Sequence, residues 1–264
     1  MKRLFAFDLD GTISVSNRRI PSDTLASVDE LRSQGNLVVF VTGRRQVDML
    51  PMRDQVSHAD YLALNNGAYV YRAGSQDNPL VHARVAPHDA RILIGESLAA
   101  DLILDVITDA EWYATRITEA DRTYAEKIGH APRLFSRVSE IDLTAIEGFM
   151  ISHAVAEMRR IIERHGLALQ CVESEPNCAD IMDAGVGKWP ALELICRAEG
   201  IDAAHVVAVG NYTNDIEMLE RAGTGVAVAD ALPEVRAVAD AVLTSRHDEN
   251  PVAELMGRIS SAET

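Results

Sequence analysis

The sequence contains few cysteines, and they follow no recognisable pattern. Cys171, Cys178 and Cys196 are the three in a chain of 264 residues, and no two of them have the spacing of a zinc knuckle or a redox motif. We interpret them as free thiols of a reducing compartment. A folded chain of this length buries about three quarters of its unfolded surface, so it needs no disulfide or zinc ion for stability.

Long hydrophobic runs are also missing. The longest, such as 37–41 and 206–209, are far shorter than the roughly 20 residues that cross a bilayer. The apolar stretch after Lys2 and Arg3 is interrupted by Asp8, so it lacks the roughly 7–15 apolar residues of a signal peptide. The sequence therefore predicts a cytoplasmic protein with no membrane partner.

Positive charge is in deficit. The chain has 25 basic against 40 acidic residues and a formal net charge of −15. Phosphate backbones and anionic membranes are bound by clustered Lys and Arg, so we expect no nucleic-acid partner. A small anionic substrate remains compatible with this charge, because a few local cations or a bound metal outweigh distant surface charges.

What the sequence does contain is an ordinary globular composition with an alternating pattern. Hydrophobic residues make up 47% and charged residues 25%, which excludes a disordered chain. Short apolar runs alternate with helical patterns, as is typical of strand–helix–strand units and a parallel α/β sheet. We predict strands at 4–7, 37–41, 61–64, 68–71, 206–209 and 225–228, and helices beginning near 22, 49, 190, 216 and 233. Ser22 is the expected N-cap of the first helix, and Gly35 its stop.

The pattern changes between about residues 83 and 184. Here the apolar runs are less uniform, and we predict helices at 87–100 and 154–165 with strands at 102–108, 147–152, 167–173 and 179–183. The last two strands are joined closely through a turn at 174–177, which indicates an antiparallel α+β insertion. The sequence thus predicts one α/β domain interrupted by an inserted domain.

Three polar loops each follow a predicted buried strand. They are 8–12, 42–44 and 210–215, and Lys188 lies where the chain re-enters the main domain. Ligands of open α/β sheets bind outside the carboxyl ends of the strands, so we expect these loops to converge. Each also has an ordinary interpretation, but together these would require four unrelated polar coincidences at one sheet edge.

The first loop carries two carboxylates two residues apart. Asp8 and Asp10 repel each other unless a cation lies between them, so the pair implies a metal or a raised pKa. Oxygen donors with no nearby His or Cys favour a hard cation, most simply Mg²⁺. The alternative is a strand end followed by an Asp-Gly turn, which needs no chemistry.

The other loops offer groups suited to an anion. Thr42 and Gly43 present a hydroxyl and an unobstructed backbone N–H before a helix, unless Thr42 is an ordinary cap. Lys188 could neutralise phosphate or be a solvated side chain. Asn214 and Asp215 could belong to the site or cap the helix that follows them.

In order along the chain, these motifs resemble those of the haloacid dehalogenase (HAD) superfamily. The resemblance rests on Asp8-Leu9-Asp10-Gly11-Thr12, Thr42-Gly43-Arg44, Lys188 and Gly210-Asn211-Tyr212-Thr213-Asn214-Asp215-Ile216-Glu217-Met218-Leu219. Asn65-Asn66-Gly67-Ala68, the insertion after the third strand and Gly187-Lys188 resemble its Cof-type sugar-phosphatase branch.

The resemblance implies a Rossmann-like core of about residues 1–83 and 184–264 and an inserted α/β cap domain at 84–183. It implies Mg²⁺-dependent hydrolysis of small phosphorylated metabolites, such as sugar phosphates, through an aspartyl-phosphate. Asp8 is then the nucleophile and Asp10 the general acid and base.

The resemblance also implies which groups bind the substrate and the metal. Phosphate would be held by Thr42, Gly43, Lys188 and Asn214. Mg²⁺ would be held by Asp8, the Asp10 backbone carbonyl and the last loop, for which we name Asn211 and Asp215. Positioning and charge neutralisation are the main requirements of phosphoryl transfer, and these groups supply both.

One position departs from the family pattern. Asn211 stands where the superfamily usually has an aspartate that binds Mg²⁺ directly. An amide oxygen still ligates a hard cation but carries no charge, so we expect weaker Mg²⁺ binding. Asp215 could compensate by moving inward.

Several assignments stay open at this point. Arg44 is a candidate contact for a substrate anion, and four residues of the insertion are candidates for substrate selection, with packing, turn or solvated roles as their alternatives: Trp112, Tyr113, Glu173 and Asn177. The alternative functions are a phosphomutase and a phosphate-ligand binding protein with weakened catalysis. The sequence carries no signal for the oligomeric state.

Overall fold

The chain folds into two compact units, and the computed structural model describes residues 2–15, 19–175 and 177–262. The first unit comprises residues 1–82 and 187–264, and the second comprises residues 83–186. The boundaries expected from the sequence, at 83/84 and 183/184, differ from these by one and three residues. Within the described residues, no helix has the length and apolar character needed to span a membrane.

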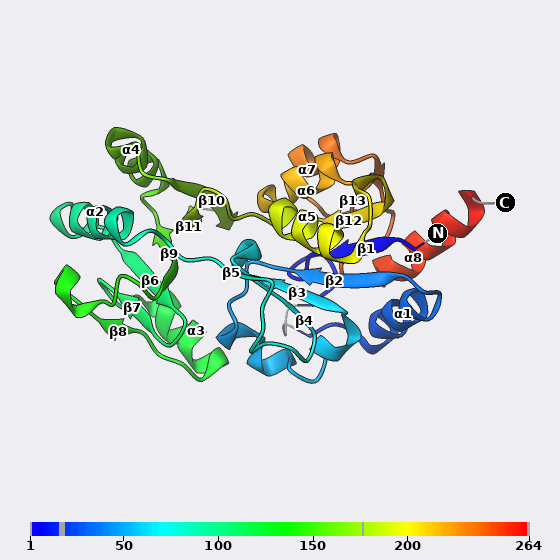
Figure 1. Ribbon diagram of the computed structural model, residues 1–264, viewed down its shortest axis with the longest axis horizontal. Coiled ribbons are helices and arrows are strands. Elements are labelled where there is room, and N and C mark those ends of the chain that lie inside the picture. The colour runs from blue at the N-terminus through cyan, green and yellow to red at the C-terminus, as the bar shows by residue number, and fades with distance from the viewer. Residues whose placement is uncertain (1, 16–18, 176, 263–264) are drawn as a thin grey trace. The chain divides into compact units, whose positions relative to one another are not determined.

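The first unit is built on an eight-stranded sheet with the order β14-β13-β12-β1-β2-β3-β4-β5 (Figure 1). The strands from β14 to β3 are parallel, and β4 and β5 continue the sheet in antiparallel fashion. Their bounds are β1 Leu4–Phe7, β2 Leu37–Val41, β3 Tyr61–Leu64, β4 Tyr69–Arg72, β5 Val81–His82, β12 Val206–Gly210, β13 Thr224–Ala227 and β14 Ala241–Val242. The predicted α/β class is confirmed.

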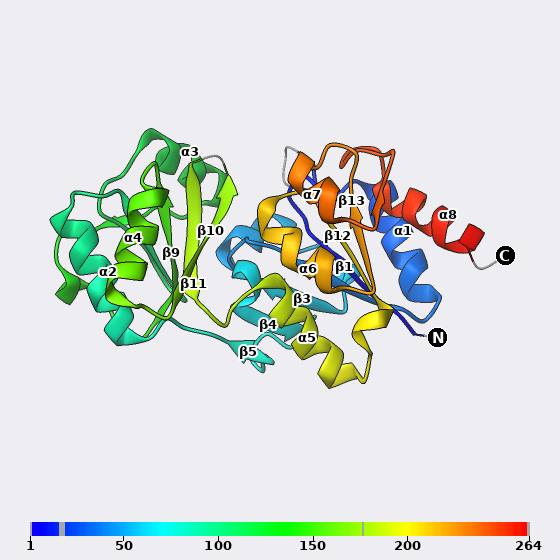
Figure 2. The ribbon, with the colours of Figure 1, turned by 90° about the horizontal axis from the view of Figure 1, so that it is seen from above.

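Helices cover both faces of this sheet. The helices α5 (Lys188–Glu199), α6 (Ile216–Arg221) and α7 (Pro233–Val238) lie on one face, and α1 (Ser22–Ser33) and α8 (Pro251–Ala262) lie on the other (Figures 1 and 2). This arrangement explains why every residue of β1 and β2 is buried. A strand covered on both sides reads as a continuous apolar run rather than as an alternating one.

Two local predictions in this unit need correction. The first helix begins at Ser22 itself, and Pro21 takes the N-cap position. Proline's restricted backbone suits the entry to a helix, so the prediction misplaced the cap by one residue. The helix expected from residue 49 to 55 is a short 3₁₀ helix at Val47–Met52 that contains Pro51, because a proline removes a backbone donor that a longer helix would need.

The second unit is an α+β domain, as predicted for the insertion. Its six-stranded sheet has the order β10-β11-β9-β6-β7-β8 and is antiparallel apart from the β7–β8 pair. The strands are β6 Leu104–Thr108, β7 Trp112–Ala114, β8 Arg133–Leu134, β9 Ile146–Ser152, β10 Leu169–Glu175 and β11 Cys178–Asp183. The helices α2 (Pro87–Ala99) and α4 (Val155–His165) pack together against its hydrophobic core. Pro176, in the predicted 174–177 turn, lies outside the described residues.

A third helix in this unit, α3 (Glu119–Ile128), is absent from the sequence-based prediction. Tyr124 of α3 packs edge-on against Trp112, at 6.0 Å between ring centroids. The neighbouring Tyr113 packs instead with the core of α2 and α4, and successive residues of a strand point to opposite faces. Helix α3 therefore covers the face of the sheet opposite to α2 and α4.

The C-terminal helix is tied to the sheet by one carboxylate. Glu254 of α8 accepts hydrogen bonds from the backbone N–H of Thr244, at 3.0 Å, and of Ser245, at 2.7 Å, and it pairs with Arg258 at 2.6 Å. Partial burial acts to raise the pKa of Glu254, but the hydrogen bonds from Thr244 and Ser245 outweigh it and lower the pKa to about 2. The charged form of this side chain therefore stabilises the fold.

We expect Glu254→Gln to lower the free energy of unfolding by about 2 kcal/mol at pH 7, the size of a hydrogen bond to a charged group. Because the pKa is lowered, the stabilisation is complete above the usual value of 4.5 and is lost as the pH falls towards about 2. Urea unfolding at pH 7 and at pH 3 should show the difference between variant and wild type shrinking at the lower pH. Exposed Glu220→Gln is the control, and a pH-independent loss in Glu254→Gln would contradict the assignment.

Candidate active site

The polar loops meet at the carboxyl ends of the central strands of the first unit, because these strands are parallel and in register. Phe7, the last residue of β1, lies opposite Phe40 of β2 and Val209 of β12. The residues that follow, Asp8 and Thr42 among them, therefore leave the sheet side by side. The expected convergence at the carboxyl ends of the strands is found.

A buried lysine joins two of these loops. Lys188 Nζ lies 2.7 Å from Asp8 Oδ1 and 2.6 Å from Asp215 Oδ1, and the exposed fractions of the three residues are 3%, 5% and 0%. Lys188 is the first residue of α5 and is inside the protein, so the solvated alternative is wrong. Burial acts to lower its pKa, but the carboxylates of Asp215 and Asp8 outweigh it, so the pKa is raised and the ammonium group stays charged.

The carboxyl group of Asp8 has a strongly raised pKa. Burial raises its pKa to about 7, with a further contribution from the charge of Asp215, although Lys188 opposes the shift. Two buried carboxylates share one ammonium group, so the cluster carries one negative charge more than its cation neutralises. A raised pKa is one of the two consequences that the Asp8–Asp10 spacing predicted, although burial is its main cause and Asp215 contributes more than Asp10.

Thr12 connects the first loop to the last. Its hydroxyl lies 2.8 Å from Asp8 Oδ2 and 3.0 Å from Asn211 Oδ1. A hydroxyl has one proton to donate, so it can satisfy only one of these two oxygens at a time. Sequence reasoning quoted Thr12 within the first motif but gave it no role. Its position four residues after Asp8, behind the Gly11 turn, is the signal that was available.

Asp215 shapes the last loop. Its Oδ2 accepts hydrogen bonds from the backbone N–H of Asn211, at 2.8 Å, and of Tyr212, at 3.0 Å. A Cβ at Gly210 would lie 2.5 Å from the Asp215 carboxyl carbon, so only glycine fits there. Asp215 does occupy the N-cap position of α6, but its side chain is directed to the loop and to Lys188. Asp215 therefore organises the last loop and orients Lys188.

The second loop brings Thr42 and Gly43 to the same edge. Thr42 is buried, and its Oγ1 accepts a hydrogen bond from the Arg44 backbone N–H at 3.1 Å. The 3₁₀ helix after this loop begins at Val47, several residues further on. The Thr42 hydroxyl therefore stabilises a turn at the site and does not cap that helix, which removes the ordinary alternative for this residue.

Arg44 is engaged with Asp10. Its Nε and Nη2 lie 2.7 Å and 2.6 Å from the two Asp10 carboxylate oxygens, and its Nη1 contacts Met52 Sδ. The arginine side chain is 3% exposed while that of Asp10 is 52% exposed. Arg44 therefore orients Asp10 in a two-pronged ion pair instead of pointing towards open solvent.

Asn214 contacts Asn66, a residue of the Cof-type motif to which the sequence assigns no individual role. Its Nδ2 donates to Asn66 Oδ1 at 3.0 Å. The Cof-type resemblance includes this segment, but it does not indicate which loop the Asn66 side chain reaches.

The four candidates in the second unit fit their ordinary interpretations. Trp112 is buried, and Tyr113 packs edge-on against Phe135. Glu173 pairs with Arg159 at 3.1 Å, and the Asn177 carbonyl accepts a backbone hydrogen bond. We give none of these residues a role in selecting substrate.

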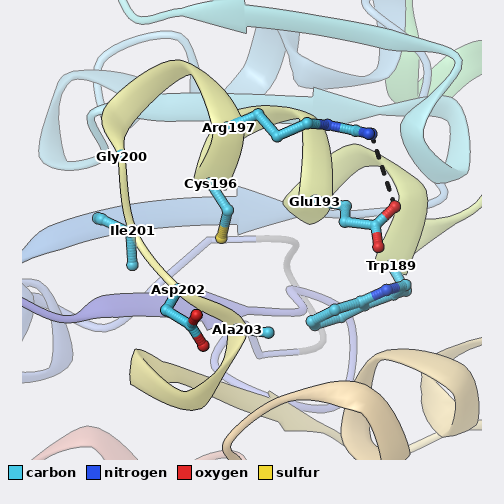
Figure 3. Close-up of a pocket in the computed structure, with 8 residues that line it drawn as sticks. All are labelled: Trp189, Glu193, Cys196, Arg197, Gly200, Ile201, Asp202 and Ala203. Atoms are coloured by element: carbon cyan, nitrogen blue, oxygen red, sulfur yellow. Dashed lines mark ion pairs between the residues drawn. The ribbon is translucent and has the colours of Figure 1, made fainter.

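A pocket of about 410 Å³ lies away from this cluster (Figure 3). It is lined by Trp189 and residues of the C-terminal half of α5, and by 200–203, which lead into the amino end of β12. None of the residues that line this pocket belongs to the polar loops at the carboxyl ends of the strands. The pocket is therefore not where the candidate chemistry is assembled.

The oxygen donors of the cluster suit a hard cation, but together they carry less negative charge than a set of carboxylates would. Asp8 Oδ2 and Asn211 Oδ1 converge on the single Thr12 hydroxyl, so at least one of them keeps an acceptor site that this proton does not fill. The described residues contain no group of three or more His, Cys, Asp or Glu side chains placed to hold a metal. A divalent ion here would thus depend on Asp8, an amide oxygen and backbone carbonyls, a donor set that Mg²⁺ accepts.

The fold and the order of the motifs define a hydrolase of the haloacid dehalogenase type. Residues 5–256 match the model of the haloacid dehalogenase-like hydrolase family, and the chain belongs to this family. It is a Cof-type member, as the sequence resemblance predicted.

Named relatives extend over nearly the whole chain. An HMP-PP phosphatase of Serratia proteamaculans is 26% identical over 243 residues, covering 90% of this chain and 88% of the relative. A haloacid dehalogenase-like hydrolase from Bacteroides thetaiotaomicron has a similar structure, with a TM-score of 0.82, 22% identity and coverage of 98% and 100%. A HAD subclass IIB sugar phosphatase also has a TM-score of 0.82, with 21% identity and coverage of 98% and 99%. At these identities the two structures support the fold alone.

Proposed function

We propose that the protein is a Mg²⁺-dependent phosphatase that hydrolyses small phosphorylated metabolites, sugar phosphates among them. The observation that carries the proposal is the buried Asp8–Lys188–Asp215 cluster, with distances of 2.7 Å and 2.6 Å, at the edge where Thr42 also emerges. A buried carboxylate beside a fixed ammonium group suits nucleophilic attack on a phosphoryl group. The name of the HMP-PP phosphatase relative supports a small phosphorylated substrate.

In the proposed reaction the Asp8 carboxylate attacks phosphorus in line as the bond to the leaving alcohol breaks. Asp10 takes up a proton, with release of one of its two oxygens from Arg44, and donates that proton to the alcohol, while the remaining contact with Arg44 keeps the carboxyl group in place. Asp10 then removes a proton from water, which attacks the phosphorus of the aspartyl-phosphate and releases inorganic phosphate. Both steps use the general acid–base logic that a positioned carboxylate provides.

The phosphoryl oxygens are proposed to bind Thr42, the Gly43 backbone N–H, Lys188 and Asn214. Mg²⁺, held by Asp8, the Asp10 backbone carbonyl and Asn211, would supply positive charge that draws the phosphoryl group towards Asp8 and neutralises its oxygens. Lys188 supplies a second positive charge from within the protein. Asp215 keeps Lys188 oriented and holds the Asn211–Tyr212 backbone in its turn.

Hydrolysis of p-nitrophenyl phosphate tests the proposal directly. We expect turnover that requires Mg²⁺ and is lost when the metal is chelated. A phosphomutase would instead return the phosphoryl group to a sugar, so release of inorganic phosphate from sugar phosphates separates the two enzymes. Absence of turnover at every Mg²⁺ concentration, with phosphate binding retained, would contradict the proposal and leave a phosphate-binding protein.

The Asn211→Asp variant tests the metal-binding part of the proposal. We expect the Mg²⁺ concentration for half-maximal activity to fall about tenfold, equivalent to about 1.4 kcal/mol, because the added charge lies among the oxygen donors. Aspartate has nearly the same shape, so Thr12 can still donate to it. Mg²⁺ binding followed by calorimetry should tighten by a similar factor. An unchanged requirement for Mg²⁺ would remove Asn211 from the set of ligands.

A further inference from the structure

One residue of the turn after β3, Asn66, contacts both the Thr42–Gly43 loop and Asn214, which are proposed to bind the phosphoryl group. Asn66 donates its backbone N–H to the Thr42 carbonyl at 2.9 Å, and its Oδ1 accepts the hydrogen bond from Asn214 Nδ2 at 3.0 Å. A Cβ at Gly43 would lie 3.4 Å from Asn66 Oδ1, so the side chain also packs directly against this loop. Asn66 is 3% exposed, and its contacts are therefore with the protein.

The same turn contacts the start of α5. Gly67 has a φ of +97°, and a Cβ at this position would lie 2.5 Å from the Gly187 carbonyl oxygen. Gly187 immediately precedes Lys188, the cation of the site. Residues 65–67 thus contact three segments that are far apart in the sequence and that together would surround one phosphoryl group.

The orientation of the Asn214 amide matters because its two ends have opposite character. The nitrogen carries two donors and the oxygen only accepts. An anionic phosphoryl group accepts hydrogen bonds, so only the nitrogen end can bind it. Asn66 Oδ1 accepts a hydrogen bond from one of the two N–H groups of Asn214. This contact fixes the nitrogen end of the Asn214 amide towards Asn66 and leaves the second N–H available for the phosphoryl group.

We propose that Asn66 is a positioning residue whose side chain orients Asn214 for binding of the phosphoryl group, while its backbone N–H holds the Thr42–Gly43 loop. The inference rests on the proposed function, since it assigns Asn66 a task within that site. It acts through Asn214 and the loop and does not require Asn66 to contact substrate.

The backbone of the turn provides a matched pair of variants. Asn65 and Asn66 have φ values of 50° and 52°, a left-handed conformation that glycine adopts without strain. Replacing either by glycine therefore removes an amide side chain while the backbone keeps its shape. Asn65 Nδ2 has no hydrogen-bond partner among the described residues, so Asn65→Gly is the control for Asn66→Gly.

We expect Asn66→Gly to reduce kcat/KM for p-nitrophenyl phosphate by about 10- to 100-fold, as misplacement of a binding group does. Binding of inorganic phosphate in the presence of Mg²⁺, measured by calorimetry, should weaken by about tenfold. Asn65→Gly should change either quantity by less than about threefold. Thermal melting of both variants shows whether a general loss of folding contributes.

A double-mutant cycle with Asn214→Ala tests the route of action. If Asn66 works largely through Asn214, the Asn66→Gly/Asn214→Ala double variant should be at most about threefold worse than Asn214→Ala alone. Additive losses would overturn the inference, and so would equal behaviour of Asn66→Gly and Asn65→Gly in a wild-type background that turns over substrate. Failure of the wild type to hydrolyse any phosphate ester would count against the proposed function, while the effect of Asn66→Gly on phosphate binding would still decide the role of Asn66.

Discussion

Replacing Asp8 by asparagine is expected to reduce kcat for p-nitrophenyl phosphate by at least about 10⁴-fold, as loss of a covalent nucleophile does. An amide has the shape of the carboxylate but carries no charge to attack phosphorus. We expect the residual activity to stay below detection at every Mg²⁺ concentration. Steady-state rates of wild type and variant at saturating substrate provide the measurement.

Folding of this variant should be unimpaired, which separates lost chemistry from lost structure. In the wild type two carboxylates face one ammonium group, and Asp8→Asn leaves Asp215 to pair with Lys188 at 2.6 Å. The melting temperature should therefore be at least that of the wild type. Asp60→Asn is a matched control. Asp60 pairs with Arg32 at 2.9 Å and lies just before β3, at the amino ends of the strands and therefore away from the candidate site. Substantial turnover in Asp8→Asn would show that another group attacks phosphorus.

Replacing Lys188 by methionine is expected to lower both stability and activity. The substitution leaves two nearby buried carboxylates without their shared cation, and removal of one member of a buried ion pair lowers the free energy of unfolding by about 3–5 kcal/mol. Loss of a group that stabilises transition-state charge should also reduce kcat by about 10²–10³-fold. Urea unfolding and p-nitrophenyl phosphate assays measure the two effects.

Lys2→Met is the matched control for this substitution. Lys2 pairs with Glu199 at 3.1 Å, but its side chain is 45% exposed. An ion pair in solvent contributes about 1 kcal/mol or less. Lys188→Met should therefore unfold at a clearly lower urea concentration than Lys2→Met. Equal midpoints would mean that the Asp8–Lys188–Asp215 cluster does not contribute to stability as the structure indicates.

The central strands could be predicted from the sequence to the residue, and the reason lies in their burial. Leu4–Phe7, Leu37–Val41 and Tyr61–Leu64 are covered on both faces, so each is an uninterrupted apolar run. Helix α3 was missed because only Asp121 and Ile128 of its residues are buried, so its apolar side is short. Its signals are instead a capping box between Thr118 and Asp121 and a left-handed Gly129.

For the candidate site, the sequence could predict which loops meet but not which side chains pair. The parallel order of the sheet is sufficient to bring Asp8 and Thr42 to one edge. The contact between Lys188 and Asp8 joins residues 180 positions apart, and the Arg44–Asp10 ion pair depends on side-chain packing. Distances of this kind follow from the folded arrangement, which residue types and spacings do not specify.

Gly11 has a consequence for how this site can diverge. With a φ of +73°, it sits where a Cβ would lie 2.4 Å from Asn211 Nδ2. A side chain at position 11 would be strained by this left-handed backbone and would displace the Asn211 amide, so the effect of a substitution at position 211 is expected to depend on Gly11. The Asn211 side chain is in this sense placed by two loops, its own and the one that carries Asp8.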